Sequence, residues 1–494
     1  MIISPDSKDF STVLHVLGRL IVGLTLCMAL PFFWALFSKE TAPFYDFLIS
    51  ISLSGSIGIL LMIFFPIRKE MVWMHTFFIV SSGWVVASLL GAVPLYLSAH
   101  YGCFLDAWFE AMSGFATTGL TLVKDLDHIS LSPNLWRHLM MFLGGQGIIL
   151  ASLSLISQAK GSVLGFYLGE ARTEKILPNI IATARFIWRV SLSYLILGVT
   201  FLSAFLVNKG VNFIKAFFHA VCIFFASFDT GGFAPQSQNI TYYHSGFLEI
   251  ITVVLMVLGA INFNLHFWLW FKDKREIYKN FEIRTFCVSF FSLLIILFLA
   301  LRNLPGLALF RKGFYQLISA HTGCGFTNLS GQELNAFGSL ALLSIIFAMM
   351  VGGGVCSTTG GFKLMRLGVI FKSFFIETRR WMMPPKAVYK SVYHHLQDLI
   401  LEDRRIKEAF IFAGLFLITY MGGAVAGMVY GYPALSSLFE SVSATANVGL
   451  SMGITSPSMP AGLKVIYILQ MWLGRLEFLA IFVSFGFIAS LFKR

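Results

Sequence analysis

The stretch Ser113-Gly-Phe-Ala-Thr-Thr-Gly-Leu-Thr121 decides the fold, because its last five residues recur in related form three more times along the chain. Each copy has a small or polar residue, a second residue, a glycine, Leu or Phe, and a small residue. The copies are residues 117–121, 230–234, 323–327 and 447–451. Each of them lies between two long apolar segments, so the sequence predicts an internal fourfold repeat.

The four shared glycines are typical of a cation filter. Irregular backbone at membrane depth is tolerated only where protein buries it or water lines it. Glycine reaches the positive φ that lets successive carbonyls point the same way. Four such segments on one axis would replace the hydration shell of a cation with carbonyl oxygens. A Gly/Thr-rich turn that merely punctuates a loop explains one copy but not four in one frame.

We therefore expect the two residues before each glycine to supply the ion-facing carbonyls, while the glycines shape the strands. The residues expected to supply carbonyls are Thr117, Thr118, Thr230, Gly231, Gly323, Cys324, Asn447 and Val448. The shaping glycines are Gly119, Gly232, Gly325 and Gly449. A short helix before each filter segment would aim the negative end of its dipole at the ion.

Composition places the chain in a membrane. Hydrophobic residues make up 57% of it and charged residues 12%, whereas an average soluble domain is about 25% charged. The mean hydropathy is +0.78. The apolar runs predict ten full spans, each near the roughly 20 residues that a spanning helix needs. The six cysteines are scattered without the spacing of a zinc site, so neither disulfides nor bound zinc is expected.

The order of the apolar runs divides the chain into two leading helices and four repeats. Each repeat has a long helix, a half-length helix that re-enters the membrane, a filter segment and a second long helix. The expected divisions are residues 1–68 for the leading helices, 69–160, 161–272, 273–372 and 406–494 for pore repeats 1 to 4, and 373–405 for a cytoplasmic connector. The second long helices are expected at 135–157, 242–271, 335–372 and 463–491. The expected fold is thus an all-α polytopic membrane protein with four pseudo-symmetric helix–pore-loop–helix repeats around one pore, preceded by two extra transmembrane helices.

The half-length helices carry a polar residue at a constant offset. Glu110, Gln316 and Glu440 each lie nine residues before a filter glycine. In the second repeat His219 lies thirteen residues before Gly232, which predicts one extra helical turn there. Near the filters we interpret four residues as satisfied members of the half-length helices rather than as a catalytic group: Glu110, His219, Asp229 and Glu440.

The distribution of positive charge sets the orientation. Of the 36 Lys and Arg residues, 26 fall on the side that holds both termini. This bias predicts cytoplasmic termini and filter segments that face the outside. It also accounts for the net charge of +12, so membrane lipid is an expected partner and nucleic acid is not.

A glycine-rich stretch, Gly352-Gly-Gly-Val-Cys-Ser-Thr-Thr-Gly-Gly361, lies midway along the helix predicted at 335–372. Each glycine costs a helix about 1 kcal/mol relative to alanine, so the helix must break near mid-membrane. We interpret the break as a gate on the ion path, because freed backbone groups at that depth need polar partners. The glycines would let it rearrange and the hydroxyl residues would satisfy its backbone; the residues are Gly352, Gly353, Gly354, Ser357, Thr358, Thr359, Gly360 and Gly361. The alternative is a kink packed on a neighbouring helix through small residues.

Arg475 is a charged residue well inside the last predicted span. An intramembrane arginine is costly and faces water, a counter-charge or carbonyl groups. Glu477 is the nearest acid in sequence, but residues two apart do not face each other on a helix. We predict that Arg475 holds the gate through hydrogen bonds to its carbonyls and repels cations. A snorkelling or structural arginine is the alternative.

Together these features resemble the Trk/Ktr/HKT superfamily of potassium transporters. The resemblance is carried by the four pore units, by Ser357-Thr-Thr-Gly-Gly-Phe-Lys363 and by Met471-Trp-Leu-Gly-Arg-Leu-Glu477. The two leading helices are similar to the bacterial TrkH branch. The resemblance implies potassium as the substrate, no covalently bound cofactor, a location in the bacterial cytoplasmic (inner) membrane, a homodimer, and a cytoplasmic TrkA-like nucleotide-binding regulatory protein. The second filter segment, preceded by Asp229, departs from the family pattern.

Other functions find less support in the sequence. A membrane enzyme should have clustered His, Asp and Glu on facing helices, and a receptor should have a sizeable sensor domain; neither is visible. A carrier that rocks two halves about a central site should have two inverted halves rather than four repeats of the same sense. A carrier or sensor for another monovalent cation, such as sodium, is the alternative to potassium uptake.

Overall fold

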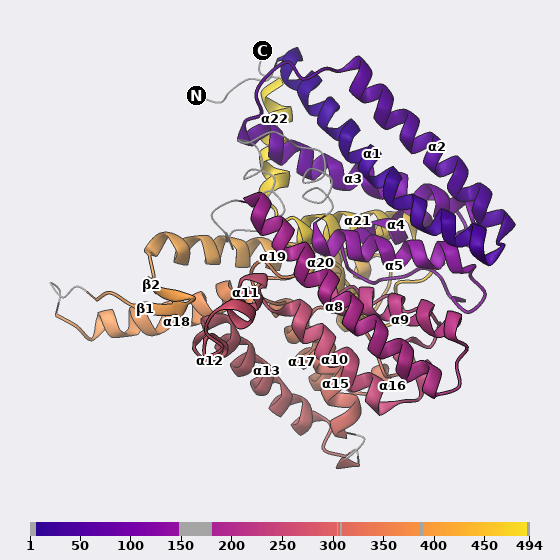
Figure 1. Cartoon of the computed structure of the whole chain (residues 1–494). Coiled ribbons are helices and arrows are strands. Elements are labelled where there is room, and N and C mark those ends of the chain that lie inside the picture. Colours follow the sequence, from indigo (N-terminus) through magenta and orange to yellow (C-terminus); the bar gives the residue numbers. More distant parts are fainter. Residues whose placement is uncertain (1–5, 148–179, 304, 307–308, 385–388, 492–494) are drawn as a thin grey trace.

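The computed structural model describes residues 6–147, 180–303, 305–306, 309–384 and 389–491 (Figure 1). The chain starts with a helical hairpin, α1 (Ser7–Ser38) and α2 (Thr41–Phe64), along one edge of the molecule. The two helices approach closely where both carry glycine, because a Cβ built on Gly18 would lie only 2.7 Å from the Gly58 carbonyl oxygen. Small residues permit such contacts between apolar helices.

Four groups of helices follow the hairpin. The first is α3 (Trp73–Leu97), α4 (Phe104–Phe115) and α5 (Leu131–Gln146). The second is α8 (Ile180–Asn208), α9 (Phe213–Phe228), the 3-10 turn η1 (Asn239–Tyr243), α10 (Gly246–Ala260) and α11 (Phe263–Phe271), and α12 (Glu276–Lys279) connects it to the third. The third is α13 (Phe281–Ala300), the π turn η2 (Leu309–Gly313), α15 (Phe314–His321), α16 (Gly331–Asn335), α17 (Ser339–Val351) and α18 (Leu364–Trp381). The fourth is α19 (Asp403–Val429), α20 (Ala434–Thr445), α21 (Ala461–Arg475) and α22 (Leu479–Leu491).

The structure bears out the expected ten full spans only in part. Among the described residues, six single helices are long and apolar enough to cross a membrane, and two bent pairs raise the number to eight. The helices predicted at 242–271 and 463–491 are these bent pairs, in which α10 and α11 meet at 101° and α21 and α22 at 107°. The helix predicted at 135–157 ends at Gln146 as α5, and residues 148–157 lie outside the described part. The break predicted in 335–372 is present, because residues 352–363 separate α17 from α18.

The second long helices break where a glycine packs against the carboxyl end of a half-length helix. A Cβ on Gly144 would lie 1.9 Å from the Phe115 carbonyl oxygen. A Cβ on Gly259 would lie 1.8 Å from that of Phe228, and a Cβ on Gly474 would lie 1.8 Å from that of Thr445. A straight helix would continue into the space beneath these half-length helices, which residues 352–363 occupy. The chain therefore turns away after Gly259 and Gly474.

The connector contains a small β hairpin, so the fold departs from the all-α expectation there. Strands β1 (Val392–His395) and β2 (Gln397–Ile400) pair in antiparallel register, Val392 opposite Ile400. The turn residue Leu396 has φ 62°. The buried Tyr393 side chain packs with Val369 and Ile376 of α18, so apolar contacts hold the hairpin against the helix.

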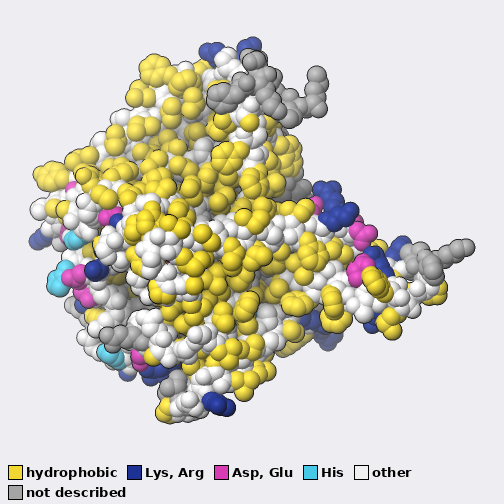
Figure 2. Space-filling view, turned by 180° about the vertical axis from the view of Figure 1, so that it is seen from behind, with side chains coloured by type: hydrophobic (Ala, Val, Ile, Leu, Met, Phe, Trp, Pro, Cys, Tyr) yellow, Lys and Arg dark blue, Asp and Glu magenta, His cyan; other side chains and the backbone are white. Residues whose placement is uncertain are grey.

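The surface is apolar over most of the face seen in Figure 2, and charged side chains gather at its margins. The half-length helices lie inside, with Phe109, Phe115 and Phe224 among the most deeply buried side chains. In contrast, only 17% of the most apolar stretch of the outer helix α13 is buried, and only 28% of that of α19. This arrangement is typical of a protein solvated by lipid, whose interior holds irregular and polar backbone.

Candidate functional site

Each half-length helix ends in the same backbone conformation. The residue two before the filter glycine is left-handed in all four copies, with φ values of 53° at Thr117, 51° at Thr230, 70° at Gly323 and 56° at Asn447. The following N–H donates to a carbonyl five residues back; the pairs are Thr118–Ser113, Gly231–Ala226, Cys324–Ser319 and Val448–Ser443, at 2.8 to 3.0 Å. This is the Schellman pattern that closes a helix C-terminus. The four helix ends therefore point their free carbonyls the same way relative to each filter segment.

The four filter segments contact one another in a closed ring. A Cβ on Gly119 would lie 2.1 Å from the Gly231 carbonyl oxygen, and a Cβ on Gly232 would lie 2.1 Å from that of Cys324. A Cβ on Gly325 would lie 1.8 Å from the Val448 carbonyl oxygen, and a Cβ on Gly449 would lie 2.1 Å from that of Thr118, which closes the ring. The four glycines also have φ values of 86°, 73°, 83° and 94°. No side chain fits at these positions, so the structure brings carbonyls of all four segments to one ring.

Three of the segments are braced by the polar residue of their own half-length helix. Glu110 Oε1 accepts a hydrogen bond from the Thr121 hydroxyl at 2.8 Å. Gln316 Oε1 accepts from Thr327 at 3.0 Å, and Glu440 Oε1 accepts from Ser451 at 2.5 Å. The donor is two residues after the glycine in every case. The interpretation of Glu110 and Glu440 as satisfied helix members is therefore confirmed, whereas Gln316 Nε2 has no hydrogen-bond partner among the described residues. All three residues fix the outer half of their segments.

The second segment is braced differently because Ala234 has no hydroxyl group. Asn134 Nδ2 donates to the Pro235 carbonyl at 3.0 Å, and His138 Nε2 lies 3.2 Å from the Phe233 carbonyl oxygen. His219 contacts the Tyr243 hydroxyl at 2.6 Å. Helix α9 has 16 residues, whereas α4 and α20 have 12 each, so the extra turn predicted from His219 is present.

A cavity of about 290 Å³ lies above the ring, lined by residues that follow the glycines. Beneath the ring, residues 352–363 form a loop that contacts the second, third and fourth segments. Thr358 Oγ1 donates to the Phe228 carbonyl at 3.1 Å and lies 3.2 Å from Thr230 Oγ1. A Cβ on Gly360 would lie 2.6 Å from the Ala446 carbonyl oxygen. The loop, which we call the gate loop, therefore fills the space directly below the ring.

Arg475 joins the gate loop to the first repeat. Its Nη1 donates to the Thr358 carbonyl at 2.7 Å and to Thr117 Oγ1 at 3.1 Å. Its Nη2 donates to the Gly144 carbonyl at 2.6 Å. Glu477, the nearest acid in sequence, instead pairs with Arg366 of α18. Arg475 thus presents a fixed positive charge beside the loop and next to the first filter segment.

A sequence model of the TrkH family, described as a cation transport protein, matches residues 46–491. The chain belongs to the TrkH family of cation transport proteins. It is 31% identical to an uncharacterized cation transporter of Methanocaldococcus jannaschii, over 97% of this chain and 96% of that protein. It is 27% identical to the Trk system potassium uptake protein TrkH of Escherichia coli, over 96% and 98% of the two chains.

The fold of this TrkH-family chain also has a solved counterpart. The crystal structure of the potassium transporter TrkH from Vibrio parahaemolyticus superimposes with a TM-score of 0.81, at 24% identity, over 96% of this chain and 98% of that one. The protein is accordingly a multi-pass membrane protein of a transporter family and not an enzyme.

Sequence analysis missed the partners that hold the TrkH-family gate loop from the side of repeats 2 and 3. The broken helix pair supplies backbone partners: Gly354 N donates to the Ala260 carbonyl at 2.9 Å, and Phe263 N donates to the Cys356 carbonyl at 3.2 Å. Glu282 Oε1 accepts from Val355 N at 2.7 Å. Glu282 is an acid at the start of an apolar span, a signal that could have identified it.

Lys363 is a second missed residue of the gate loop. Its ammonium group donates to the Thr359 carbonyl at 2.5 Å and lies 3.3 Å from Thr359 Oγ1. The side chain is 5% exposed, and no carboxylate pairs with it among the described residues. A buried cation is therefore satisfied by loop oxygens. Lys363 is the last residue of the Ser357–Lys363 motif that carries the family resemblance, and the sequence by itself predicts no role for it.

Proposed function

We propose that this TrkH-family protein takes up potassium across the cytoplasmic (inner) membrane of a bacterial cell, with both termini in the cytoplasm. The closed ring of four glycine-shaped segments carries the proposal, because it gathers the carbonyl oxygens of Thr118, Gly231, Cys324 and Val448. Carbonyl rings of this kind replace the hydration shell of potassium. The ion would pass along one axis through four pseudo-symmetric repeats without covalent chemistry or a bound cofactor.

The gate loop is the proposed barrier below the filter. Thr358 and Gly360 sit against the ends of the second and fourth half-length helices, where the ion would leave the ring. Arg475 adds a positive charge at the same level. A loop held by hydrogen bonds can have a second arrangement only a few kcal/mol away, so a small open population accounts for regulated flux.

The proposed assembly is a homodimer regulated by a cytoplasmic TrkA-like nucleotide-binding protein. It is supported by the similarity to Trk system potassium uptake proteins along nearly the whole chain. Helix α18 and the β hairpin follow the gate loop in the chain, and we propose them as the contact points for a protein that pulls on the loop.

Uptake of rubidium into proteoliposomes containing the purified protein tests the function. We expect rubidium to enter the vesicles when a cation gradient is directed inward. Added potassium should compete strongly with rubidium uptake, and added sodium should compete only weakly. Equal competition by sodium would favour the alternative, a carrier for another monovalent cation. No uptake by a folded, correctly inserted protein, in either orientation of the gradient, would contradict the proposal.

A further inference from the structure

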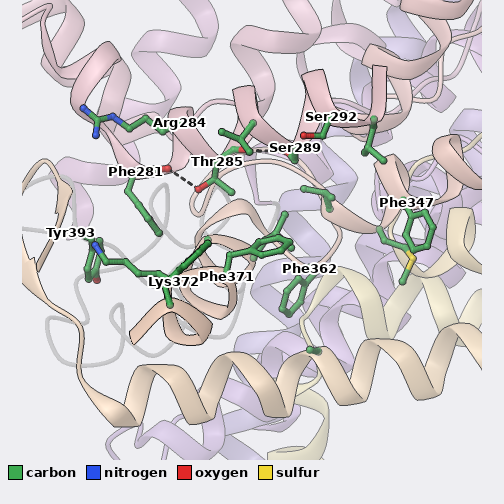
Figure 3. A pocket seen from close by; sticks show the side chains of 18 of the residues that line it. Phe281, Arg284, Thr285, Ser289, Ser292, Phe347, Phe362, Phe371, Lys372 and Tyr393 are labelled. Carbon is green, nitrogen blue, oxygen red and sulfur yellow. Dashed lines mark hydrogen bonds between the residues drawn. The ribbon is translucent and has the colours of Figure 1, made fainter. Parts of the chain in front are cut away.

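A second, larger cavity lies between α13, α18 and α19 (Figure 3). Its volume is about 1200 Å³. The walls are mainly aromatic and aliphatic; they include Phe281, Phe347, Phe362, Phe371, Phe375 and Phe416. The cavity follows α13 from Phe281 to Leu293, which is about 18 Å of helix. That length matches about half of the roughly 30 Å hydrocarbon core, the depth of one leaflet.

One end of the cavity is cationic. Lys279, Arg284 and Lys372 line it there, and Figure 3 shows Arg284 and Lys372 toward the end that holds Tyr393, with Phe347 at the other. None of the three cations pairs with a carboxylate among the described residues. Asp398 also lines the cavity, but this acid and the nearby Glu276 both contact His394, at 2.7 and 3.0 Å. Among the described residues, Arg284 and Lys372 donate to backbone carbonyls, those of Tyr278 and Val392.

The position of the cationic end agrees with the surface of a membrane leaflet. Helix α18 exposes Phe371, Phe374 and Phe375 and also carries Arg379 and Arg380. An amphipathic helix of this kind lies in the plane of the interface with its apolar face in the acyl region. In the topology above, this interface is the cytoplasmic one. Deeper in the cavity, the Tyr420 hydroxyl is buried without a hydrogen-bond partner among the described residues.

We propose that the cavity binds one anionic phospholipid of the cytoplasmic leaflet. Lys279, Arg284 and Lys372 would hold the phosphate group, and an acyl chain would lie along α13 toward Phe347. Basic pockets between transmembrane helices on the cytoplasmic side are suited to such head groups. A second copy of this chain, related by a two-fold axis through the cationic end, would set like charges against each other.

The proposed lipid would touch both ends of the gate loop. Met350 and Val351 precede the loop and Phe362 is its last residue but one, and all three line the cavity. The Phe362 N–H also donates to the Met350 carbonyl at 3.2 Å. A bound acyl chain would therefore bias how the loop packs. This effect on flux rests on the proposed function, whereas the binding site itself does not.

Native mass spectrometry tests binding of the lipid. The full-length protein is first equilibrated with equal amounts of phosphatidylglycerol and phosphatidylcholine. We expect preferential retention of phosphatidylglycerol. Each of Lys279→Gln and Arg284→Gln should weaken it about fivefold, the effect of roughly one interfacial charge. Lys274→Gln, an exposed neighbour outside the cavity, should leave it unchanged. Equal retention of both lipids by the parent, or an equal loss in the Lys274 control, would overturn the proposal.

A steric variant gives a test independent of charge. Val288 lines the cavity, whereas Ile295 lies on the same helix outside it, and both side chains are exposed, at 69% and 62%. Val288→Trp should displace the lipid and Ile295→Trp should not. If Val288→Trp instead converts a dimer to a monomer while the parent retains no lipid, the cavity is an interface between copies and the proposal is wrong.

Rubidium flux separates the two proposals. With phosphatidylglycerol bound, flux in vesicles that contain it should differ from flux in pure phosphatidylcholine vesicles, and Arg284→Gln should remove the difference. Lipid retention with no rubidium flux under any condition would support the site and contradict potassium uptake. Rubidium flux without selective lipid retention would support potassium uptake and contradict the lipid site.

Discussion

At the scale of single residues, the filter depends on glycine for two separate reasons. The left-handed backbone is one, and Thr117, Thr230 and Asn447 show that other residues can adopt it where space allows. Contact is the other, because a Cβ on Gly119 would overlap the Gly231 carbonyl oxygen at 2.1 Å. Glycine is therefore required where one segment's backbone touches the next, not only where φ is positive.

The substitution Gly119→Ser should erode discrimination between potassium and sodium. A side chain there must displace the Gly231 carbonyl, so we expect the rubidium-to-sodium flux ratio to fall about tenfold, equivalent to roughly 1.4 kcal/mol. Gly431→Ser is the matched control, because Gly431 has φ 87° like the 86° of Gly119 but nothing within 4 Å of an added Cβ. An equal loss in both variants would trace the effect to backbone strain rather than to the ring.

The buried ion pair between Arg137 and Glu110 should dominate the stability of the first segment. Both side chains are fully buried and their N–O distance is 2.6 Å. Arg137→Met leaves an uncompensated buried carboxylate, so we expect about 3–5 kcal/mol of destabilisation. Arg404→Met, which breaks an exposed pair with Glu408, should cost under about 1 kcal/mol. Thermal unfolding in detergent compares the two, and similar midpoints would contradict this.

At the scale of elements, the breaks in the second long helices and the gate loop form one unit. The bend after α10 frees the Ala260 carbonyl and the Phe263 N–H, and the gate loop uses both. The bend after α21 leaves Arg475 at a helix end, where its guanidinium reaches three different elements. The helices thus break where their backbone groups and side chains have partners in the loop.

Removing the arginine contact should loosen the gate loop. A hydrogen bond from a charged donor contributes about 1.5–3 kcal/mol, so Arg475→Ala should raise basal rubidium flux about tenfold or more. Potassium selectivity should persist, because Arg475 contacts the Thr117 hydroxyl and takes no part in the glycine–carbonyl contacts that close the ring. Arg475→Lys keeps the charge with fewer donors and should give an intermediate flux. Parent-like flux from a folded Arg475→Ala protein would place the barrier elsewhere.

At the scale of the whole molecule, the cytoplasmic β hairpin connects parts of the chain that are far apart. His394 of β1 contacts Asp398 of β2 at 2.7 Å and Glu276 of α12 at 3.0 Å, and Leu396 N donates to Glu276 at 3.0 Å. One imidazole thus ties the connector before the fourth repeat to the junction between the second and third. Movement of the hairpin would displace α18, which follows the gate loop in the chain and packs against the hairpin.

The hairpin contact should weaken as pH rises. Hydrogen bonds to the Glu276 and Asp398 carboxylates raise the pKa of His394 above its usual 6.5. A raised pKa means that the stabilisation is fully present below about pH 6.5 and is lost as pH passes through the raised value. We expect amide hydrogen exchange in residues 392–400, corrected for the intrinsic rate, to increase between about pH 6 and 9. His394→Gln should flatten this dependence, and an unchanged profile in that variant would assign it to another group.

Much of the fold and part of the site could be read from the sequence by itself. The apolar runs, the half-length helices and the frame shared by Gly119, Gly232, Gly325 and Gly449 are local patterns of hydropathy and backbone freedom. The constant offset of Glu110, Gln316 and Glu440 belongs to the same class, because a helix and the strand that follows it are close in sequence. The glycine-rich break at 352–361 was evident for the same local reason, the poor helix propensity of glycine.

Only the tertiary structure decided how these parts meet. The bends after α10 and α21, the contact of Glu282 with the gate loop and the ring between Gly449 and Thr118 join residues far apart in sequence. Hydropathy reports which segments enter the membrane, but not which carbonyl a distant glycine touches. A long apolar run has the same composition whether it is straight or bent at 107°. Its path depends on which neighbours satisfy the freed backbone groups, and that is set by packing in three dimensions.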